Sequence, residues 1–258
     1  MGCHVLYIVY FLGNRKYRQY ITEGARNLQP FNNRESIYTS TVWPEVSIHS
    51  RTDHLLLKSK HAFAIIGNAI FGEQGHADHI VNWKVSKDLD CTDPVQLMIN
   101  QFRHWDYPAH TGTGLMTAAN LHRASIQEEA GNGYRLLCCV TAGTGNAARS
   151  GTARPTYEDV HAGTINIILL MDVNLTPGAR INAIMTATEA KAAALQDEQV
   201  RDHLTGDIAT GTTSDAIVLG MNEQSTKPAY RYAGTVTPIG NAIGRLVYLA
   251  VREAVAAQ

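Results

Sequence analysis

Cysteine is scarce in this chain of 258 residues, which carries only Cys3, Cys91, Cys138 and Cys139. No pair has C-x-x-C spacing, and no spacing is typical of a structural zinc site. This use of cysteine fits a reducing compartment, so we expect the protein to be cytoplasmic. Cys138 and Cys139 are adjacent within the apolar run 134–140. A strand there would point the two thiols to opposite faces, where both serve as small core residues.

An excess of charge is also absent, since 22 Lys and Arg residues balance 23 Asp and Glu residues to a net charge of −1 at pH 7. Nucleic-acid binding needs a basic patch that neutralises phosphates, and this balance leaves little room for one. The 21 glycines and 8 prolines are too few to suggest low complexity or disorder. We expect one globular domain over residues 1–258, of which 1–60 carry the weakest pattern, and no nucleic-acid partner.

Long hydrophobic runs are missing as well. The longest covers residues 5–12, far short of the roughly 18 residues that a membrane-spanning helix needs. Arg15, Lys16 and Arg18 follow this run, whereas a signal peptide has its basic residues before the apolar core. The pattern therefore predicts a strand at 5–12 and no membrane partner.

Three helix starts are clearly marked, because Pro directly follows a capping side chain at Asp93-Pro94, Thr176-Pro177 and Thr237-Pro238. An N-cap oxygen with Pro at the first helical position is a strong start signal. The many alanines of the second helix permit close packing against a neighbouring element. The third helix is expected to bury one stripe almost to the C-terminus: Ile239, Ala242, Ile243, Leu246, Val247, Ala250 and Ala254.

Strand-like runs lie between these helices, at 62–71, 79–85, 134–140, 164–171 and 215–219. Adjacent strands without an intervening helix favour an α+β fold, with helices packed on a mixed, largely antiparallel sheet. The order strand, strand, helix and Gly/Thr-rich element occurs twice, over 62–119 and 134–220. Two similar strand-strand-helix-strand halves are therefore compatible with the sequence.

The loop at 141–149 is the first candidate binding segment. It leaves an apolar strand and gathers two glycines, a hydroxyl, an amide and a guanidinium: Gly143, Thr144, Gly145, Asn146 and Arg149. Such a loop can bring backbone N–H groups close to a ligand. The spacing also satisfies a dinucleotide fingerprint, but no long apolar-striped helix follows, which disfavours a nicotinamide site. A tight connection with a capping Asn is the alternative.

A second group of small polar residues lies at 209–215, where Thr210, Thr212 and Asp215 lead into a strand. Hydroxyls suit oxyanion or phosphate contacts, while a carboxylate can orient a base or hold a water. On the strand that begins at Thr164, alternation puts Thr164 and Asn166 on one face and the apolar side chains on the other. Polar groups at one end of a buried strand indicate a cavity.

Titratable groups are densest at 76–84. Asp78 and Asn82 share one face of a strand there, and His79 and Trp83 share the other. No third distant ligand and no H-E-x-x-H motif accompany the two histidines, so we expect no metal site. Glu189 lies one turn beyond Met185 on the alanine-rich helix, where it is either a pocket-facing carboxylate or an exposed charge.

Six ordered segments resemble the adenosylcobinamide amidohydrolase family, from about residue 68 to the C-terminus. The segments are G-L-M-T-A-A (114–119), C-V-T-A-G-T-G-N-A-A-R (139–149), G-T-I-N-I-I-L-L-M-D-V-N-L-T-P-G-A (163–179), T-A-T-E-A-K-A-A-A-L (186–195), A-T-G-T-T-S-D-A-I (209–217) and Y-A-G-T-V-T-P-I-G (232–240). The family often reads A-T-G-T-G-T-D in the fifth segment, so Thr213 and Ser214 depart from its pattern.

The resemblance implies hydrolysis of the amide that joins the corrin f side chain of adenosylcobinamide to aminopropanol, which gives adenosylcobyric acid for corrinoid salvage. The cobalt corrinoid is then the substrate, and no cofactor is expected. A non-catalytic corrinoid- or nucleotide-binding protein is the alternative. A homo-oligomer is compatible with either function.

The hydrolase function suggests roles for the candidate residues. Asn146 with the backbone of 143–146, or Thr210 and Thr212, would bind the oxyanion. Asp215, Glu189 or the Asp78/His79 pair would transfer protons. Arg149 would bind polar corrin side chains. The remaining candidates for substrate contact are Gly143, Thr144, Gly145, Thr164, Asn166, Asn82 and Trp83.

Overall fold

The computed structural model describes residues 29–258 except for 34, 90–91, 157–163 and 225–227. The strand expected at 5–12 and two of the cysteines, Cys3 and Cys91, lie outside the described residues. Within them, no helix combines the length and apolar character that crossing a membrane requires.

The described elements follow one another in this order. They are η1 (Pro30–Asn33), β1 (Ile37–Thr39), β2 (Val46–Ser50), β3 (His54–Gly67), β4 (Gln74–Lys84), α2 (Pro94–His104), η2 (Ala109–Thr111), β5 (Gly112–Thr117), η3 (Leu121–Arg123), β6 (Ser125–Gly131), β7 (Tyr134–Ala142), β8 (Ala147–Ala148), β9 (Ile165–Met171), α3 (Pro177–Asp197), β10 (Gly211–Thr212), β11 (Ala216–Met221) and α4 (Pro238–Ala256).

A nine-stranded sheet forms the centre, in the order β1-β2-β3-β11-β9-β7-β6, with β4 added on β3 and β5 on β4. Its pairs are antiparallel except for β9 with β11 and β4 with β5, which are parallel. The expected α+β class with a mixed, largely antiparallel sheet is confirmed. A second, two-stranded sheet pairs β8 with β10, and it joins the two loops that the sequence singled out.

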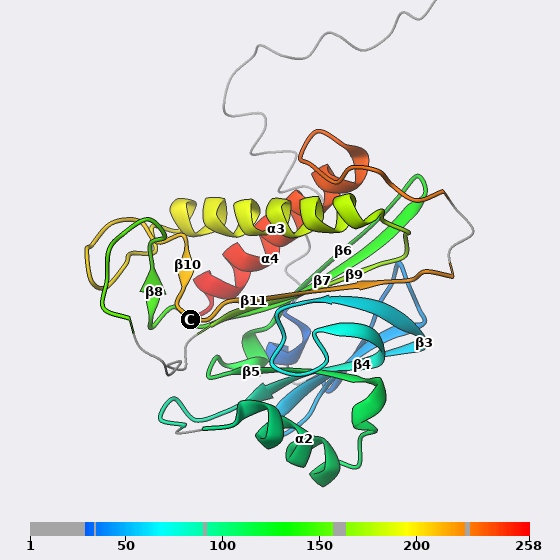
Figure 1. The fold of residues 1–258 in the computed structure, drawn as a ribbon, viewed down its shortest axis with the longest axis horizontal. Helices are drawn as coiled ribbons and strands as arrows, with labels where there is room; N and C mark the ends of the chain where they lie inside the picture. The colour runs from blue at the N-terminus through cyan, green and yellow to red at the C-terminus, as the bar shows by residue number, and fades with distance from the viewer. Residues whose placement is uncertain (1–28, 34, 90–91, 157–163, 225–227) are drawn as a thin grey trace, which may run out of the picture.

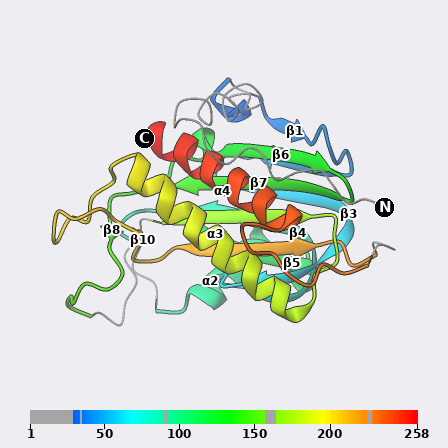
Figure 2. The same ribbon diagram turned by 90° about the horizontal axis from the view of Figure 1, so that it is seen from above.

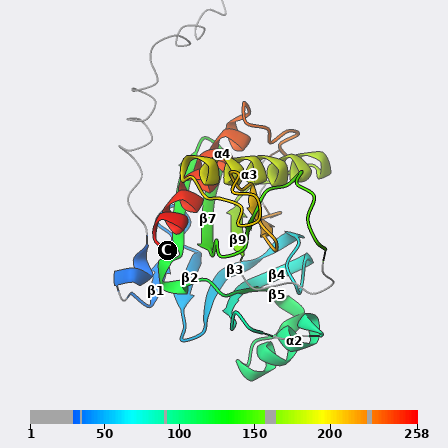
Figure 3. The same cartoon turned by 90° about the vertical axis from the view of Figure 1, so that its left-hand side faces the viewer.

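The sheet is curled so that its two parts face each other, and helices cover both outer surfaces (Figures 1 and 3). One apolar cluster lies between the two parts and includes Leu57, Ile80, Leu170 and Val218. A second joins α3 and α4 to β7, β9 and β11, and a third packs α2 on β3 and β4. Figure 2 shows α3 and α4 side by side across their part of the sheet. The layers are therefore helix, strands, strands, helix.

The two halves expected from the sequence have the same connectivity. In the first, β3 and β4 pair antiparallel, α2 follows, and β5 returns parallel to β4. In the second, β7 and β9 pair antiparallel, α3 follows, and β11 returns parallel to β9.

All three helices begin where the sequence predicts. The side chains of Asp93, Thr176 and Thr237 accept hydrogen bonds from backbone N–H groups in the first turn, with Pro as the first helical residue each time. The expected stripe of α4 is buried throughout. On α2, Met98 and Phe102 are buried, while Val95 in the first turn is exposed.

The two described cysteines lie on β7, and their thiols occupy different apolar clusters on opposite faces of the sheet, as the alternation predicts. Burial raises the pKa of the Cys139 thiol to about 12 and that of Cys138 well above its ordinary value. Both thiols are therefore protonated core groups at neutral pH.

Candidate functional site

One end of the fold is hollowed by a cavity of about 1490 Å³. Its walls come from the ends of β3 and β5, the start of β9, one face of α3, and the loops that carry β8 and β10. The residues of this wall include Asn68, Met116, Arg149, Ser150, Arg154, Thr164, Thr188, Glu189, Lys191, Thr210, Gly211, Thr212, Thr213, Ser214 and Asp215.

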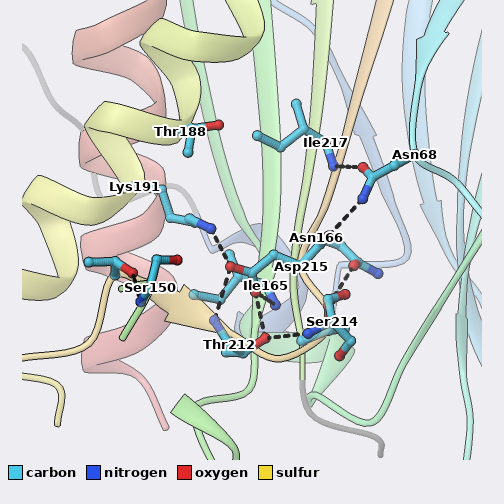
Figure 4. Close-up of polar contacts among 12 residues, drawn as sticks. Asn68, Ser150, Ile165, Asn166, Thr188, Lys191, Thr212, Ser214, Asp215 and Ile217 are labelled. Carbon is cyan, nitrogen blue, oxygen red and sulfur yellow. Dashed lines mark hydrogen bonds and ion pairs between the residues drawn. The ribbon is translucent and has the colours of Figure 1, made fainter. Parts of the chain in front are cut away.

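An ion pair between Lys191 and Asp215 forms the innermost charged group of this wall. Lys191 projects from α3, and its Nζ meets Oδ2 of Asp215 at the start of β11 (Figure 4). Lys191 is only 6% exposed, and a lysine is rarely so buried without a partner. The pair is held tightly between helix and sheet by this contact.

Gly211 makes room for the pair. A Cβ built on this residue would lie 2.4 Å from Oδ2 of Asp215 and 2.7 Å from Nζ of Lys191. Both distances are far below van der Waals contact, so a side chain here would have to displace the charged groups. The glycine in this loop is therefore a packing requirement of the ion pair.

The Asp215 carboxylate has hydrogen bonds on both oxygens. Oδ1 accepts the Thr212 hydroxyl at 2.6 Å and the Ile165 N–H at 3.0 Å, while Oδ2 accepts the Thr212 N–H at 3.0 Å besides Lys191. The backbone carbonyl of Asp215 also accepts from the Asn68 amide at 2.8 Å. These bonds fix the orientation of the Asp215 carboxylate. Two side chains donate to it: the charged ammonium of Lys191 and the neutral hydroxyl of Thr212.

Three other hydroxyls of the cavity wall engage backbone groups. Thr164 donates to the carbonyl of Ser214 at 2.6 Å, and Thr188 donates to the carbonyl of Ile184, one turn earlier on α3. Thr210 accepts from the N–H of Ser150 at 2.9 Å, which joins the β8 and β10 loops. These bonds shape the wall of the cavity around Thr212.

A buried amide network supports this wall from below. Asn166 donates to the side chain of Asn82 at 2.8 Å and to the carbonyl of Met116 at 2.9 Å. Asn82 in turn donates to the Thr141 hydroxyl at 2.8 Å. Thr164 and Asn166 do share one face of β9, as predicted, but Asn166 and Asn82 are buried structural groups that tie the two parts of the sheet together and do not line the cavity.

The loop 143–146 lies behind the cavity. Gly143 donates its N–H to Thr164, Thr144 donates to the Gln258 side chain, and the Asn146 amide donates to the Thr213 hydroxyl at 2.6 Å. None of residues 143–146, Gly145 included, belongs to the cavity wall. Asn146 and Asp215 are therefore linked through the hydroxyl-rich loop, while only Asp215 lines the cavity.

Arg149 and Arg154 do line the cavity, and buried Asp202 positions their segment. Asp202 accepts the Arg149 N–H at 2.8 Å and forms an ion pair with Arg154. The Arg149 N–H, and after it the Leu204 N–H and Arg154, hold the pKa of this carboxyl below its ordinary value despite burial. The Arg149 guanidinium donates to the carbonyl of Ile208 at 2.8 Å. The wall is therefore cationic here and built on a fixed carboxylate.

Of two further predicted site regions, Glu189 lines the cavity and the segment around His79 does not. Glu189 is exposed and lines the cavity on the same helix as Lys191. Asp78, His79 and Trp83 lie apart from the cavity, on the α2 side: Nδ1 of His79 and Oδ1 of Asp78 are 2.5 Å apart, and Trp83 packs edge-on against Trp105. Among the described residues no group of three His, Cys, Asp or Glu side chains is placed to hold a metal ion.

Several residues of this wall escaped the sequence interpretation. Lys191 lies in an alanine-rich helix, where a single lysine is normally expected to be exposed. Only its spacing of one turn from Thr188 indicates that the two residues share a face. Asn68 and Arg154 of the wall, and Asp202 behind it, lie in stretches without motif character. Gly211 lies within the hydroxyl-rich loop that the sequence singled out. Its role in making room for the ion pair could not be predicted, because Lys191 comes from α3, which is distant in the sequence.

Comparison with known proteins finds a family match over most of the described region. A model of the family described as adenosylcobinamide amidohydrolase matches residues 40–258. The chain is 26% identical over 211 residues to the adenosylcobinamide amidohydrolase of Methanosarcina mazei, which covers 79% of this chain and 94% of that protein. It is 33% identical over 162 residues to the uncharacterized protein MJ1613 of Methanocaldococcus jannaschii, over 56% of this chain and 62% of that protein.

Among solved structures, the crystal structure of the PH0078 protein from Pyrococcus horikoshii OT3 covers 81% of this chain and 78% of its own, at 11% identity and a TM-score of 0.40. The family match also reaches further towards the N-terminus than the segments quoted above, since it includes β2 and β3.

Proposed function

This chain belongs to the adenosylcobinamide amidohydrolase family, and from that membership we propose the following reaction for it. The protein hydrolyses the amide between the corrin f side chain of adenosylcobinamide and aminopropanol, and the product is adenosylcobyric acid. The cobalt corrinoid is substrate, and the proposal requires no further cofactor or macromolecular partner. A cytoplasmic location is part of the same proposal.

The observation that carries this proposal is the cavity around Lys191 and Asp215. Its volume of about 1490 Å³ exceeds the roughly 300–1,000 Å³ usual for drug-sized ligands, which suits a substrate as large as a corrinoid. Hydroxyls, two arginines and a buried ion pair meet in this one space. A large ligand and a polar reaction centre are what the hydrolysis of a corrinoid side chain requires.

Hydrolysis of an amide has three demands. An oxygen nucleophile adds to the carbonyl carbon, the negative charge on the carbonyl oxygen is stabilised, and the leaving nitrogen is protonated as the C–N bond breaks. The hydroxyl of Thr210, on the cavity wall, is suited to stabilise the oxyanion. Glu189, exposed at the wall, is suited to protonate the departing aminopropanol nitrogen.

Arg149 and Arg154 are suited to the periphery of the corrin, which carries amide side chains. A guanidinium donates in a fixed fork and so can hold a planar amide oxygen. Asp202 holds both arginines in place, and we therefore assign them to substrate binding. Asn82, Asn166 and the loop 143–146 support the wall from behind, and Trp83 belongs to the α2 side.

A direct assay tests the proposal against a protein that binds corrinoids without cleaving them. Purified protein is incubated with adenosylcobinamide, and free aminopropanol and a more acidic corrinoid are quantified by chromatography. Catalytic release of both products in equal amounts is expected. A corrinoid that co-elutes with the protein, is retained at stoichiometric amounts and stays chemically unchanged would favour the binding protein instead.

A further inference from the structure

We propose that Thr212 is the nucleophile of the reaction, with Asp215 as its base and Lys191 as the group that positions Asp215. The inference rests on the proposed amide hydrolysis and adds a covalent acyl-enzyme to it. Three contacts carry it: the Thr212 hydroxyl on Oδ1 of Asp215, the Thr212 N–H on Oδ2, and the Lys191 ammonium on Oδ2.

Threonine hydroxyls of the cavity wall differ in their hydrogen-bond partners. Thr164 and Thr188 donate to backbone carbonyls, which cannot take up their protons. Thr210 and Thr213 receive hydrogen bonds from N–H groups. Thr212 also accepts the Ser214 N–H, at 3.5 Å, but it differs from these four because its hydroxyl donates to a carboxylate at 2.6 Å. A nucleophilic hydroxyl needs a base within hydrogen-bond reach, and this pair has that geometry.

Three groups besides the Thr212 hydroxyl fix the orientation of the Asp215 carboxylate. Lys191 and the Thr212 N–H both bind Oδ2 of Asp215, and the Ile165 N–H binds Oδ1 together with the hydroxyl. The carboxylate plane is thus fixed by two backbone groups and a buried ammonium, with Oδ1 directed at Thr212. Nucleophile, base and an orienting third group occur together, which is the arrangement that activated hydroxyls share in unrelated hydrolases.

The ion pair of Lys191 and Asp215 is largely buried. Lys191 is 6% exposed and the Asp215 side chain 11% exposed, while both belong to the cavity wall. Burying an ion pair is costly, and replacing one with apolar groups is often neutral or stabilising. A buried pair at the wall of a large cavity, next to a hydroxyl, therefore indicates a functional role more than a structural one.

The acylation step balances as follows. The Thr212 oxygen forms a bond to the amide carbon, its proton moves to Oδ1 of Asp215, and the carbonyl electron pair moves to the oxygen. When the tetrahedral species collapses, the C–N bond breaks and the nitrogen keeps the pair. That nitrogen takes a proton from Glu189 and leaves as aminopropanol, so Thr212 carries the corrin acyl group as an ester. The proton on Asp215 then passes through solvent to Glu189, and both carboxyl groups regain their starting protonation before water attacks.

Deacylation reverses the roles with water. A water oxygen adds to the ester carbon and Asp215 takes its proton. Collapse then breaks the C–O bond to Thr212, and the proton on Asp215 returns to the threonine oxygen. The net change is the addition of one water to the amide, with adenosylcobyric acid and aminopropanol as products.

The test uses the full chain with three variants and two substrates. Aminopropanol release is measured for wild type, Thr212→Ala, Thr212→Ser and Thr205→Ala, the last being a matched change in an exposed loop outside the cavity. We expect Thr212→Ala to slow kcat by roughly 10³-fold or more, as for other lost nucleophiles, with Thr212→Ser retaining measurable turnover and Thr205→Ala unchanged.

Partitioning of the intermediate provides the second readout. Wild-type turnover is run with hydroxylamine, on adenosylcobinamide and on the corresponding amide of aminoethanol. A common acyl-enzyme predicts one ratio of hydroxamate to free acid for both substrates, because the leaving amine is gone before partitioning. A ratio that differs between the two amines, absence of hydroxamate, or Thr212→Ala turnover within about tenfold of wild type would overturn the inference.

The positioning role of Lys191 has its own measurement. Lys191→Met is expected to lower kcat with little change in KM, and Lys191→Arg to restore part of the loss. A purely structural lysine would instead change the unfolding midpoint and leave kcat per folded molecule intact. If wild type releases no aminopropanol at all, the proposed function fails; if it turns over while Thr212→Ala does too, only the nucleophile assignment fails.

Discussion

Gly211 leaves room for the Asp215 carboxylate across the turn that joins β10 to β11, because a Cβ on Gly211 would lie 2.4 Å from Oδ2 of Asp215. The Asp215 side chain cannot retreat, because Ile165, Thr212 and Lys191 all hold it. This close approach makes the glycine a sensitive point of the site.

Gly211→Ala is therefore expected to displace the carboxylate and reduce turnover by roughly 10²-fold, the usual effect of a displacement near 1 Å in a reacting group. Gly178→Ala is the matched control, since nothing lies within 4 Å of a Cβ there and the residue is helical. Turnover and the unfolding midpoint are measured for both. Equal activity of the two variants would show that the ion pair tolerates movement.

Glu189→Gln tests the proposed proton donor. A neutral amide cannot protonate the leaving nitrogen, so kcat should fall by roughly 10²–10⁴-fold while KM changes little. Glu223→Gln is the control, because Glu223 pairs with Arg180 and lies outside the cavity wall. A Glu189→Gln variant with wild-type kcat would remove this residue from the mechanism.

Stability in acid should depend on Asp202. Its pKa is lowered in the folded protein, first by the Arg149 N–H, so the charged carboxylate stabilises the fold above the ordinary carboxyl range. That contribution is lost as pH falls through the lowered pKa. Asp202→Asn should consequently lower the denaturation midpoint most at neutral pH, with the gap to wild type closing in acid.

Asp207→Asn is the control for this experiment, since Asp207 lies in the same loop and is exposed. Denaturant titrations at pH 7 and pH 3 provide the comparison. A gap between wild type and Asp202→Asn that stays constant with pH would contradict the role assigned to the charge.

The two buried cysteines should be dispensable for chemistry. Their thiols have raised pKa values and belong to the apolar core, so Cys138→Ala with Cys139→Ala should retain turnover per folded molecule. The double variant should lose roughly 1–3 kcal/mol in the free energy of unfolding through lost packing. A folded double variant without activity would contradict this expectation.

Chelation should leave most of the activity in place, because His76, Asp78 and His79 were the best metal candidates in the sequence and lie outside the cavity wall. The measurement is aminopropanol release after exhaustive treatment with a chelator, followed by addition of single divalent ions. Loss of activity on chelation and its return with one ion would require a metal in the reaction.

The helices were predictable because their signals are local: a capping side chain, a Pro and a stripe of apolar residues each lie within a few turns. β1, β2, β6 and the first half of β3 were not recognised, and β5 was expected only as a Gly/Thr-rich element of the first half. β6 reads S-I-Q-E-E-A-G, with acidic residues and Gly in place of an apolar run, and its strand state comes from pairing with β7.

The residues of the site likewise fall into those that a local pattern predicts and those that depend on tertiary contacts. The hydroxyl-rich loop and Asp215 were recognisable because their composition is unusual where a strand begins. Lys191 was not, since its burial depends on how α3 crosses the end of β11, and no local pattern records that crossing. Asn146 was assigned to the cavity from loop composition, whereas its hydrogen bond to Thr213 turns it towards the back of the wall.

The pairing of β3 affects how the protein folds while it is being synthesised on the ribosome. Its first half pairs with β2 and β4, which are close in the chain, but residues 64–67 pair with residues 218–221 of β11. Until β11 has been synthesised, that stretch of β3 keeps an unpaired edge, and open edges are templates for aggregation. A nascent or truncated chain that ends before β11 should therefore depend on chaperones to stay soluble.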